Sequence, residues 1–184
     1  MAATTPYVAL FRGINVGKAK RVAMADLRRM IEGLGYTGVR TLLNSGNAVF
    51  FGPAGRAADA SARIEQGLAK ACGVVSRVLV LDGPALRTIL AENPYGEVPD
   101  PPKLLVLVLF DAGDVKKLEP LRNRDWSPQR LEVGSRAAYL WCPQGISAGP
   151  LADEAMKALA QAATGRNWAT LRKLEAMLKT EPGG

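Results

Sequence analysis

The sequence predicts an α+β protein made of two ferredoxin-like, βαββαβ-type halves packed together. Three observations support this fold class. Short apolar segments of strand length alternate with segments whose apolar residues recur at helical spacing. Two short polar turns join consecutive strands in the manner of β-hairpins. The order of strand, helix and hairpin then restarts after the proline-rich stretch at residues 93–102.

The first half is predicted over residues 1–94 and begins with a strand at Tyr7–Phe11, which is apolar and rich in strand-favouring residues. A helix follows, and its apolar residues recur at helical spacing: Met24, Leu27, Ile31 and Leu34. Gly35 is the residue that ends this helix.

A hairpin and a second helix complete the first half. The hairpin pairs Val39–Leu43 with Ala48–Phe51 across a polar turn. The second helix buries a face of apolar residues, which are Ile64, Leu68 and Cys72. A strand at Val74–Leu81 and a short helix opened by Pro84 bring the chain to Asn93-Pro94.

Residues 95–102 are predicted as a linker, and residues 103–184 as a second α+β half with a C-terminal helix. Lys103–Phe110 is almost continuously apolar, which predicts a strand buried on both faces. Gln129–Val133 and Arg136–Cys142 flank a second hairpin turn at Gly134-Ser135. Three helices are expected around apolar residues at helical spacing, beginning near Val115, Leu151 and Leu171.

Composition narrows the possible chemistry. The chain of 184 residues carries a formal charge of +7, which favours anionic partners. It contains no histidine, so Ser–His–Asp and Cys–His catalysis are excluded within this chain. Two separated cysteines predict neither a disulfide scaffold nor a zinc site, and no metal is expected.

The sequence also bears on localisation. No apolar stretch approaches the roughly 18 residues of a membrane span. The first residues lack the basic and apolar regions of a signal peptide. We therefore expect a cytoplasmic protein with no membrane partner, and the oligomeric state stays open.

A glycine-containing loop, Arg12-Gly13-Ile14-Asn15-Val16-Gly17-Lys18, follows the first strand. It fails the Walker pattern because its glycines are one residue too close and Ala19 stands in place of the hydroxyl residue. It fails the dinucleotide pattern because Asn15 replaces the second glycine. Glycines next to basic residues can still present backbone amides to a phosphate group. The sequence equally allows a solvated surface turn in which the glycines supply positive φ angles.

Two further polar clusters are candidates. Ser45-Gly46-Asn47 lies in the first hairpin turn, where sterics alone explain these residue types. Its adjacency to the opening loop depends on strand pairing and stays open. Arg166-Asn167-Trp168 follows an expected Thr-Gly turn, with Asn167 as the N-cap of the last helix and Trp168 in the core. Arg166 beside a helix N-terminus is a candidate anion site.

These motifs, taken in order, resemble the bacterial domain-of-unknown-function family 1697. The motifs that carry the resemblance are Arg12–Gly17, Ser45–Asn47, Asn93-Pro94 and Arg166–Trp168. The resemblance runs from Tyr7 to Leu178 and implies two ferredoxin-like halves but no established reaction. Lys18 and Ala169 depart from the usual pattern of the family, where a glycine and an asparagine are common.

We predict a binding module for a small anionic, nucleotide-like ligand at a basic cleft. The candidate ligand-binding residues are Arg12, Gly13, Asn15, Gly17, Lys18, Ser45, Gly46, Asn47, Arg166, Asn167 and Trp168. A nucleic-acid-binding protein is one alternative, although only 6% of the residues are aromatic. An enzyme acting on an anionic substrate is another, although no nucleophile has a base near it in sequence. Catalytic residues and cofactors stay unknown.

Overall fold

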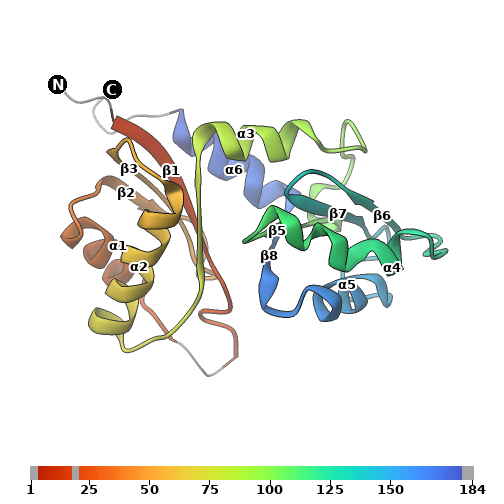
Figure 1. Cartoon of the computed structure of the whole chain (residues 1–184), viewed down its shortest axis with the longest axis horizontal. Coiled ribbons are helices and arrows are strands. Elements are labelled where there is room, and N and C mark those ends of the chain that lie inside the picture. Colours follow the sequence, from red (N-terminus) through yellow and green to blue (C-terminus); the bar gives the residue numbers. More distant parts are fainter. Residues whose placement is uncertain (1–3, 18–20, 180–184) are drawn as a thin grey trace. The chain divides into compact units, whose positions relative to one another are not determined.

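A computed structural model describes residues 4–17 and 21–179 (Figure 1). The first elements in chain order are β1 (Thr4–Phe11), α1 (Met24–Gly33), β2 (Thr37–Thr41), β3 (Asn47–Pro53), α2 (Ala57–Cys72), β4 (Val78–Asp82) and α3 (Gly83–Ala91). The later elements are η1 (Pro101–Lys103), β5 (Leu104–Leu109), η2 (Ala112–Leu118), α4 (Glu119–Arg122), β6 (Arg130–Val133), β7 (Ala137–Trp141), α5 (Leu151–Leu159), η3 (Ala160–Ala162), β8 (Ala163–Asn167) and α6 (Trp168–Leu178).

The strands form two four-stranded sheets in the orders β2-β3-β1-β4 and β6-β7-β5-β8. All neighbouring strands within each sheet are antiparallel. The hairpin at Ser45-Gly46 joins β2 to β3, and the hairpin at Gly134-Ser135 joins β6 to β7. The α+β class is therefore confirmed, and the two predicted hairpins lie in different sheets.

Internal packing divides the chain into two compact units that do not follow a single cut. The first unit runs to Arg87 and includes the C-terminal segment from Leu174, and the second unit is Thr88–Lys173. Both α3 and α6 contribute residues to each unit. In the first unit, Arg40 on β2 donates a hydrogen bond to the carbonyl of Met177 in α6. The linear boundaries at residues 94 and 102 stay a prediction.

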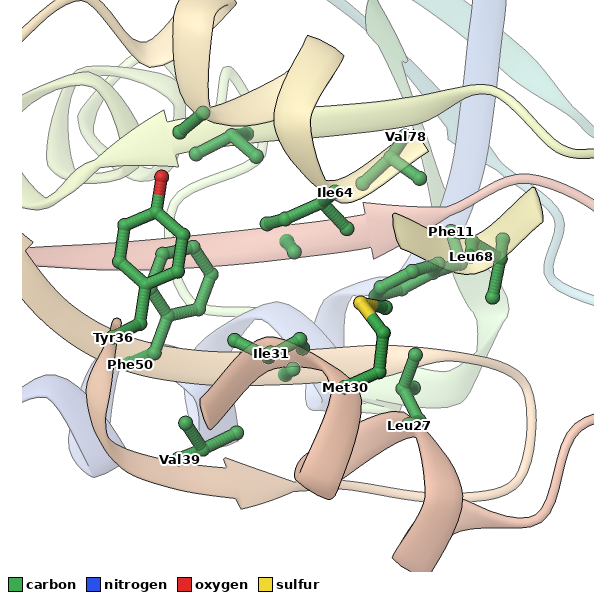
Figure 2. Close-up of a cluster of buried hydrophobic side chains, with 14 of the residues drawn as sticks. Phe11, Leu27, Met30, Ile31, Tyr36, Val39, Phe50, Ile64, Leu68 and Val78 are labelled. Atoms are coloured by element: carbon green, nitrogen blue, oxygen red, sulfur yellow. The ribbon is translucent and has the colours of Figure 1, made fainter. Parts of the chain in front are cut away.

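Helices α1 and α2 cover one face of the first sheet (Figure 1). Figure 2 shows Ile31 of α1 together with Ile64 and Leu68 of α2 among the buried side chains of this layer. The rings of Tyr36 and Phe50 pack against each other with their centroids 4.7 Å apart. The helical spacing of apolar residues found in the sequence thus places one stripe of each helix on the sheet.

The second unit is organised around β5, whose six residues are all buried. Leu105, Leu107 and Leu109 share a cluster with residues of α4 and α5. The opposite face of the sheet carries Tyr139, whose hydroxyl donates to the carbonyl of Ile89 at the end of α3. The prediction of a strand buried on both faces is confirmed. None of the helices within the described ranges is long and apolar enough to span a bilayer.

Two predicted segments differ from the structure. The strand expected from Val74 begins at Val78, because the Val74 amide instead donates to the carbonyl of Leu68 and closes the end of α2. The Thr-Gly turn expected before Arg166 is strand β8, which pairs with β5. Gly165 suits this pairing because a Cβ there would lie only 3.1 Å from a methyl carbon of Leu107.

Strand β4 lies at an edge of the first sheet, and side chains of α2 cover its outer amides. The Val78 amide donates to the Glu65 carboxylate at 2.7 Å, and the Val80 amide donates to the Ser61 hydroxyl at 3.1 Å. Unpaired edge amides invite pairing with another chain, so these two contacts close the edge. The sequence does not reveal them, because they depend on the tertiary position of α2.

Replacing Glu65 with alanine is expected to lower the free energy of unfolding by about 1–3 kcal/mol, because the buried Val78 amide loses its acceptor. Urea unfolding followed by circular dichroism measures this change. The matched control is Gln66→Ala on the exposed face of the same helix, which should stay within about 0.5 kcal/mol of the parent protein. Equal stability of the two variants would show that the edge contact contributes nothing.

Candidate functional site

Three loops meet at one end of the first sheet. Leu10 pairs with Asn47 and Phe11 pairs with Val78, so the end of β1 lies beside the starts of β3 and β4. We call the described residues of these loops, 12–17, 21–23, 42–46 and 73–77, the loop end of the first sheet (Figure 1). The adjacency that the sequence left open is therefore present: the opening loop lies against the hairpin turn.

Backbone hydrogen bonds hold these loops together. The Phe11 amide donates to the carbonyl of Gly46 at 2.9 Å. The Arg12 amide donates to the carbonyl of Arg77 at 2.9 Å, and the Ser76 hydroxyl donates to the carbonyl of Arg12 at 2.6 Å. Arg12 is half-buried at this junction. The three loops thus form one hydrogen-bonded group of segments.

Asn15 is the residue that shapes the opening loop. Its side-chain amide accepts from the Val22 amide at 2.8 Å and donates to the Val22 carbonyl at 2.9 Å. It also donates to the Asn44 carbonyl at 2.7 Å, which joins the opening loop to the hairpin turn. Both of its N–H hydrogens have partners, so Asn15 positions the loop. Its φ is 55°, a left-handed conformation that asparagine adopts more readily than most residues, so asparagine can replace the second glycine of the dinucleotide pattern here.

The hairpin turn is held from within. Asn47 is fully buried, and its amide donates to the Leu42 carbonyl at 2.8 Å and to the Ser45 hydroxyl at 3.3 Å. Gly46 has a φ of 84°, and a Cβ there would lie 2.6 Å from the Ile14 side chain. Asn47 and Gly46 therefore build the scaffold, while Ser45 is exposed at the surface.

A polar hollow of about 400 Å³ opens beside this scaffold. The residues that line it are Asn15, Arg21, Val22, Ala23, Met24 and Asn44. Helix α1 starts here, and its N-cap Ala23 supplies no side-chain acceptor for the amides of the first turn. The exposed Arg21 side chain adds a positive charge to the positive end of the helix dipole.

The hollow includes residues that the sequence analysis did not select. Arg21 and Val22–Met24 line it, whereas Gly13 and Gly17 have left-handed φ angles and do not. A usable signal is Ala23 itself, because a helix that begins without Ser, Thr, Asp or Asn leaves its first amides without a cap. Lys18 lies outside the described residues.

The third cluster belongs to the second unit. Arg166 is buried within β8 and donates to the Thr164 hydroxyl at 3.0 Å and to the Gly165 carbonyl at 2.7 Å. Burial lowers the pKa of its guanidinium to about 10. Asn167 caps α6 by accepting from the Thr170 amide at 2.9 Å, and Trp168 is buried, as the purely structural role of these two residues predicts. Ligand binding by Asn167 and Trp168 stays a prediction.

A second hollow, about 510 Å³ in volume, lies within the second unit. It joins part of the proline-rich segment to the start of α6, and its lining residues are Gly96, Glu97, Val98, Pro101, Trp168, Ala169 and Arg172. The opening loop belongs to the first unit and Arg166–Trp168 to the second, and a single site that combines them stays a prediction. Within residues 4–17 and 21–179, no group of three acidic or cysteine side chains is placed to hold a metal ion.

Comparison with known proteins gives a family and a fold. A family model described as "Protein of unknown function (DUF1697)" matches residues 4–139. A conserved bacterial protein from Streptococcus pneumoniae, SP0830, has a similar structure with a TM-score of 0.80 and 24% sequence identity. The match covers 96% of this chain and 99% of that one. None of the curated proteins matches this chain.

Proposed function

Because this chain belongs to the DUF1697 family of proteins of unknown function, we propose a function from the site itself: binding of a small phosphate-bearing ligand at the hollow beside Arg21. The observation that carries the proposal is the charge of the loop end. In the part of its three loops that the structure describes, there are three basic residues and no Asp or Glu, and the basic residues are Arg12, Arg21 and Arg77. A uniformly basic surface raises the local concentration of anions.

The contacts of the hollow add direct recognition to this general attraction. An anion beside Met24 would accept hydrogen bonds from first-turn amides of α1, where Ala23 offers no competing cap. Arg21, which also lines the hollow, would supply a charge-assisted hydrogen bond. Asn15 would act through the loop, since its hydrogen bonds fix the position of Val22 and Asn44. Nucleotides, which the sequence analysis favours, are one class of ligand with this chemistry.

The alternatives are less well supported at this surface. A single-stranded nucleic acid is held largely by bases stacked on aromatic rings, and the three loops contain no aromatic residue. An enzyme needs a positioned nucleophile or base, and the exposed Ser45 hydroxyl accepts a hydrogen bond from an amide, Asn47, which is not a base. Binding without chemistry therefore describes the surface best.

We also propose that each half of the chain is a ferredoxin-like unit. The order β2-β3-β1-β4, with antiparallel neighbours, supports this proposal for the first half. The corresponding order β6-β7-β5-β8 supports it for the second. A cytoplasmic location stays part of the same proposal.

Titration of the full chain with inorganic phosphate and with ATP, followed by amide NMR, tests the proposed site. We expect the amide signals of Ala23–Asp26 and Asn44 to shift with increasing ligand. Replacing Arg21 with glutamine is expected to weaken binding about tenfold, because a hydrogen bond to a charged group is lost.

The matched control is Arg87→Gln, which makes the same charge change at the other end of the sheet. The Arg87 guanidinium lies 3.2 Å from the position of a Cβ built on Gly83, a position that also faces Pro6. Its loss should leave affinity nearly unchanged. If the two variants weaken binding equally, the effect of Arg21 is due to net charge alone and the proposed site is refuted. Amide shifts confined to other segments would also refute it.

A further inference from the structure

Exposed aliphatic side chains gather at the loop end. The large apolar side chains exposed in the described part of the chain are Val16, Leu43, Val75 and Met156. The first three belong one each to the three loops of the loop end, where they are 67%, 55% and 78% exposed. Isolated exposed aliphatic residues are ordinary, but three from separate segments at one end of a sheet call for a physical reason.

Leu43 is also held in an unusual backbone conformation. Its φ of 59° lies in the left-handed region, which leucine rarely adopts. The turn around it is fixed, because the Leu42 amide donates to the Asn47 carbonyl and the Asn47 side chain donates back to the Leu42 carbonyl. A strained residue that presents an apolar side chain to solvent is a mark of functional surfaces.

Two polar side chains of the loop end make hydrogen bonds within the protein. Asn15 bonds to Val22 and Asn44, and the Ser76 hydroxyl bonds to the Arg12 carbonyl. With no aromatic residue in these loops, the surface offers little for reading or stacking bases. It offers positive charge and aliphatic side chains, which together match the interface of a bilayer that contains acidic lipids.

We propose that the loop end adsorbs to anionic phospholipid surfaces, with Val16, Leu43 and Val75 entering the headgroup layer. The inference rests on the proposed function, since the hollow beside Arg21 would take a lipid phosphate in place of a free one. It goes beyond the expectation of no membrane partner, which was based on the lack of a membrane-spanning segment and of a signal peptide. Adsorption needs no such segment, because inserted side chains and basic residues both contribute to binding.

Sedimentation with lipid vesicles tests the proposal on the full chain. We expect the protein to bind vesicles of mixed phosphatidylcholine and phosphatidylglycerol and not vesicles of phosphatidylcholine alone. The double variant Leu43→Asn, Val75→Ser is expected to lower the vesicle partition coefficient at least about fivefold, because two apolar side chains no longer leave water. Asparagine tolerates a positive φ, so the change at position 43 also relieves backbone strain and protects the fold.

Two controls separate this proposal from the proposed function. Met156→Gln removes an exposed apolar side chain from the second unit and should leave vesicle binding unchanged. Phosphate binding should persist in the Leu43→Asn, Val75→Ser protein. Unchanged vesicle binding by that double variant would overturn the insertion of these side chains. Phosphate binding without vesicle binding in the parent protein would overturn adsorption and leave the phosphate site standing. Tighter binding to double-stranded DNA than to the vesicles would assign the surface to nucleic acid instead.

Discussion

Replacing Gly46 with alanine is expected to lower the free energy of unfolding by about 2–5 kcal/mol, because backbone strain and overpacking add together. Gly46 has a φ of 84°, which disfavours any residue with a Cβ. The added Cβ would also lie 2.6 Å from the Ile14 Cδ1 atom and 2.7 Å from the Phe11 Cβ atom. Both neighbours are fully buried, so neither moves without disturbing the core. Urea unfolding measures the loss.

Gly13→Ala is the matched control for this prediction. Gly13 has a similar φ of 68°, but a Cβ there has no heavy atom within 4 Å. The substitution therefore isolates the backbone strain, which is about 1–2 kcal/mol for a residue with a Cβ. Equal losses for the two variants would mean that Ile14 and Phe11 move aside easily, and the tight packing between the opening loop and the hairpin turn would be refuted.

Local signals explain why much of the fold follows from the sequence. The continuous apolar run of β5 needs no knowledge of its neighbours, since any two-sided burial produces it. Asn167 is recognisable as an N-cap because its oxygen serves an amide only three residues away. The hairpin turns at Ser45-Gly46 and Gly134-Ser135 are equally local, because turn residues are chosen by φ and by short-range hydrogen bonds.

The candidate site follows less directly, because its residues act across the sheet. Asn15 looks like an imperfect phosphate-loop residue in the sequence, whereas in the structure it bridges two loops through Val22 and Asn44. Asn47 looks like a surface turn residue and is fully buried. Both roles depend on β1 lying next to β3, which single-sequence patterns do not determine. The hollow beside Arg21 also depends on this strand pairing, because Asn15 and Asn44 both line it.

Arg166 illustrates a different obstacle. Its neighbours in sequence are polar or turn-forming, which predicts a turn next to a helix N-terminus. In the structure it lies in β8 directly opposite Val106, the centre of a buried strand. A strand that is short, polar and contains a glycine gives almost no periodic signal, so its pairing with β5 has to be observed.

The pairing of Val106 with Arg166 predicts that aspartate and asparagine differ in stability in opposite directions at positions 106 and 107. Leu107 faces the apolar cluster of the second unit, where Leu107→Asp is expected to lower the free energy of unfolding by about 4 kcal/mol or more. Val106 is equally buried but stands across from the Arg166 guanidinium. Residues directly opposite in an antiparallel ladder have Cβ atoms about 5 Å apart, so a carboxylate at position 106 comes within reach of that cation.

The comparison of aspartate with asparagine isolates the charge at each position, because the two side chains have nearly the same shape. At position 107 we expect Leu107→Asn to be more stable than Leu107→Asp, since only the carboxylate loses the hydration of a full charge. At position 106 we expect the reverse, with Val106→Asp more stable than Val106→Asn by about 1–3 kcal/mol through a charge-assisted hydrogen bond to Arg166. Urea unfolding of the four variants gives both differences. If asparagine is the more stable substitution at both positions, the Arg166 guanidinium does not reach the face of β5 that carries Val106.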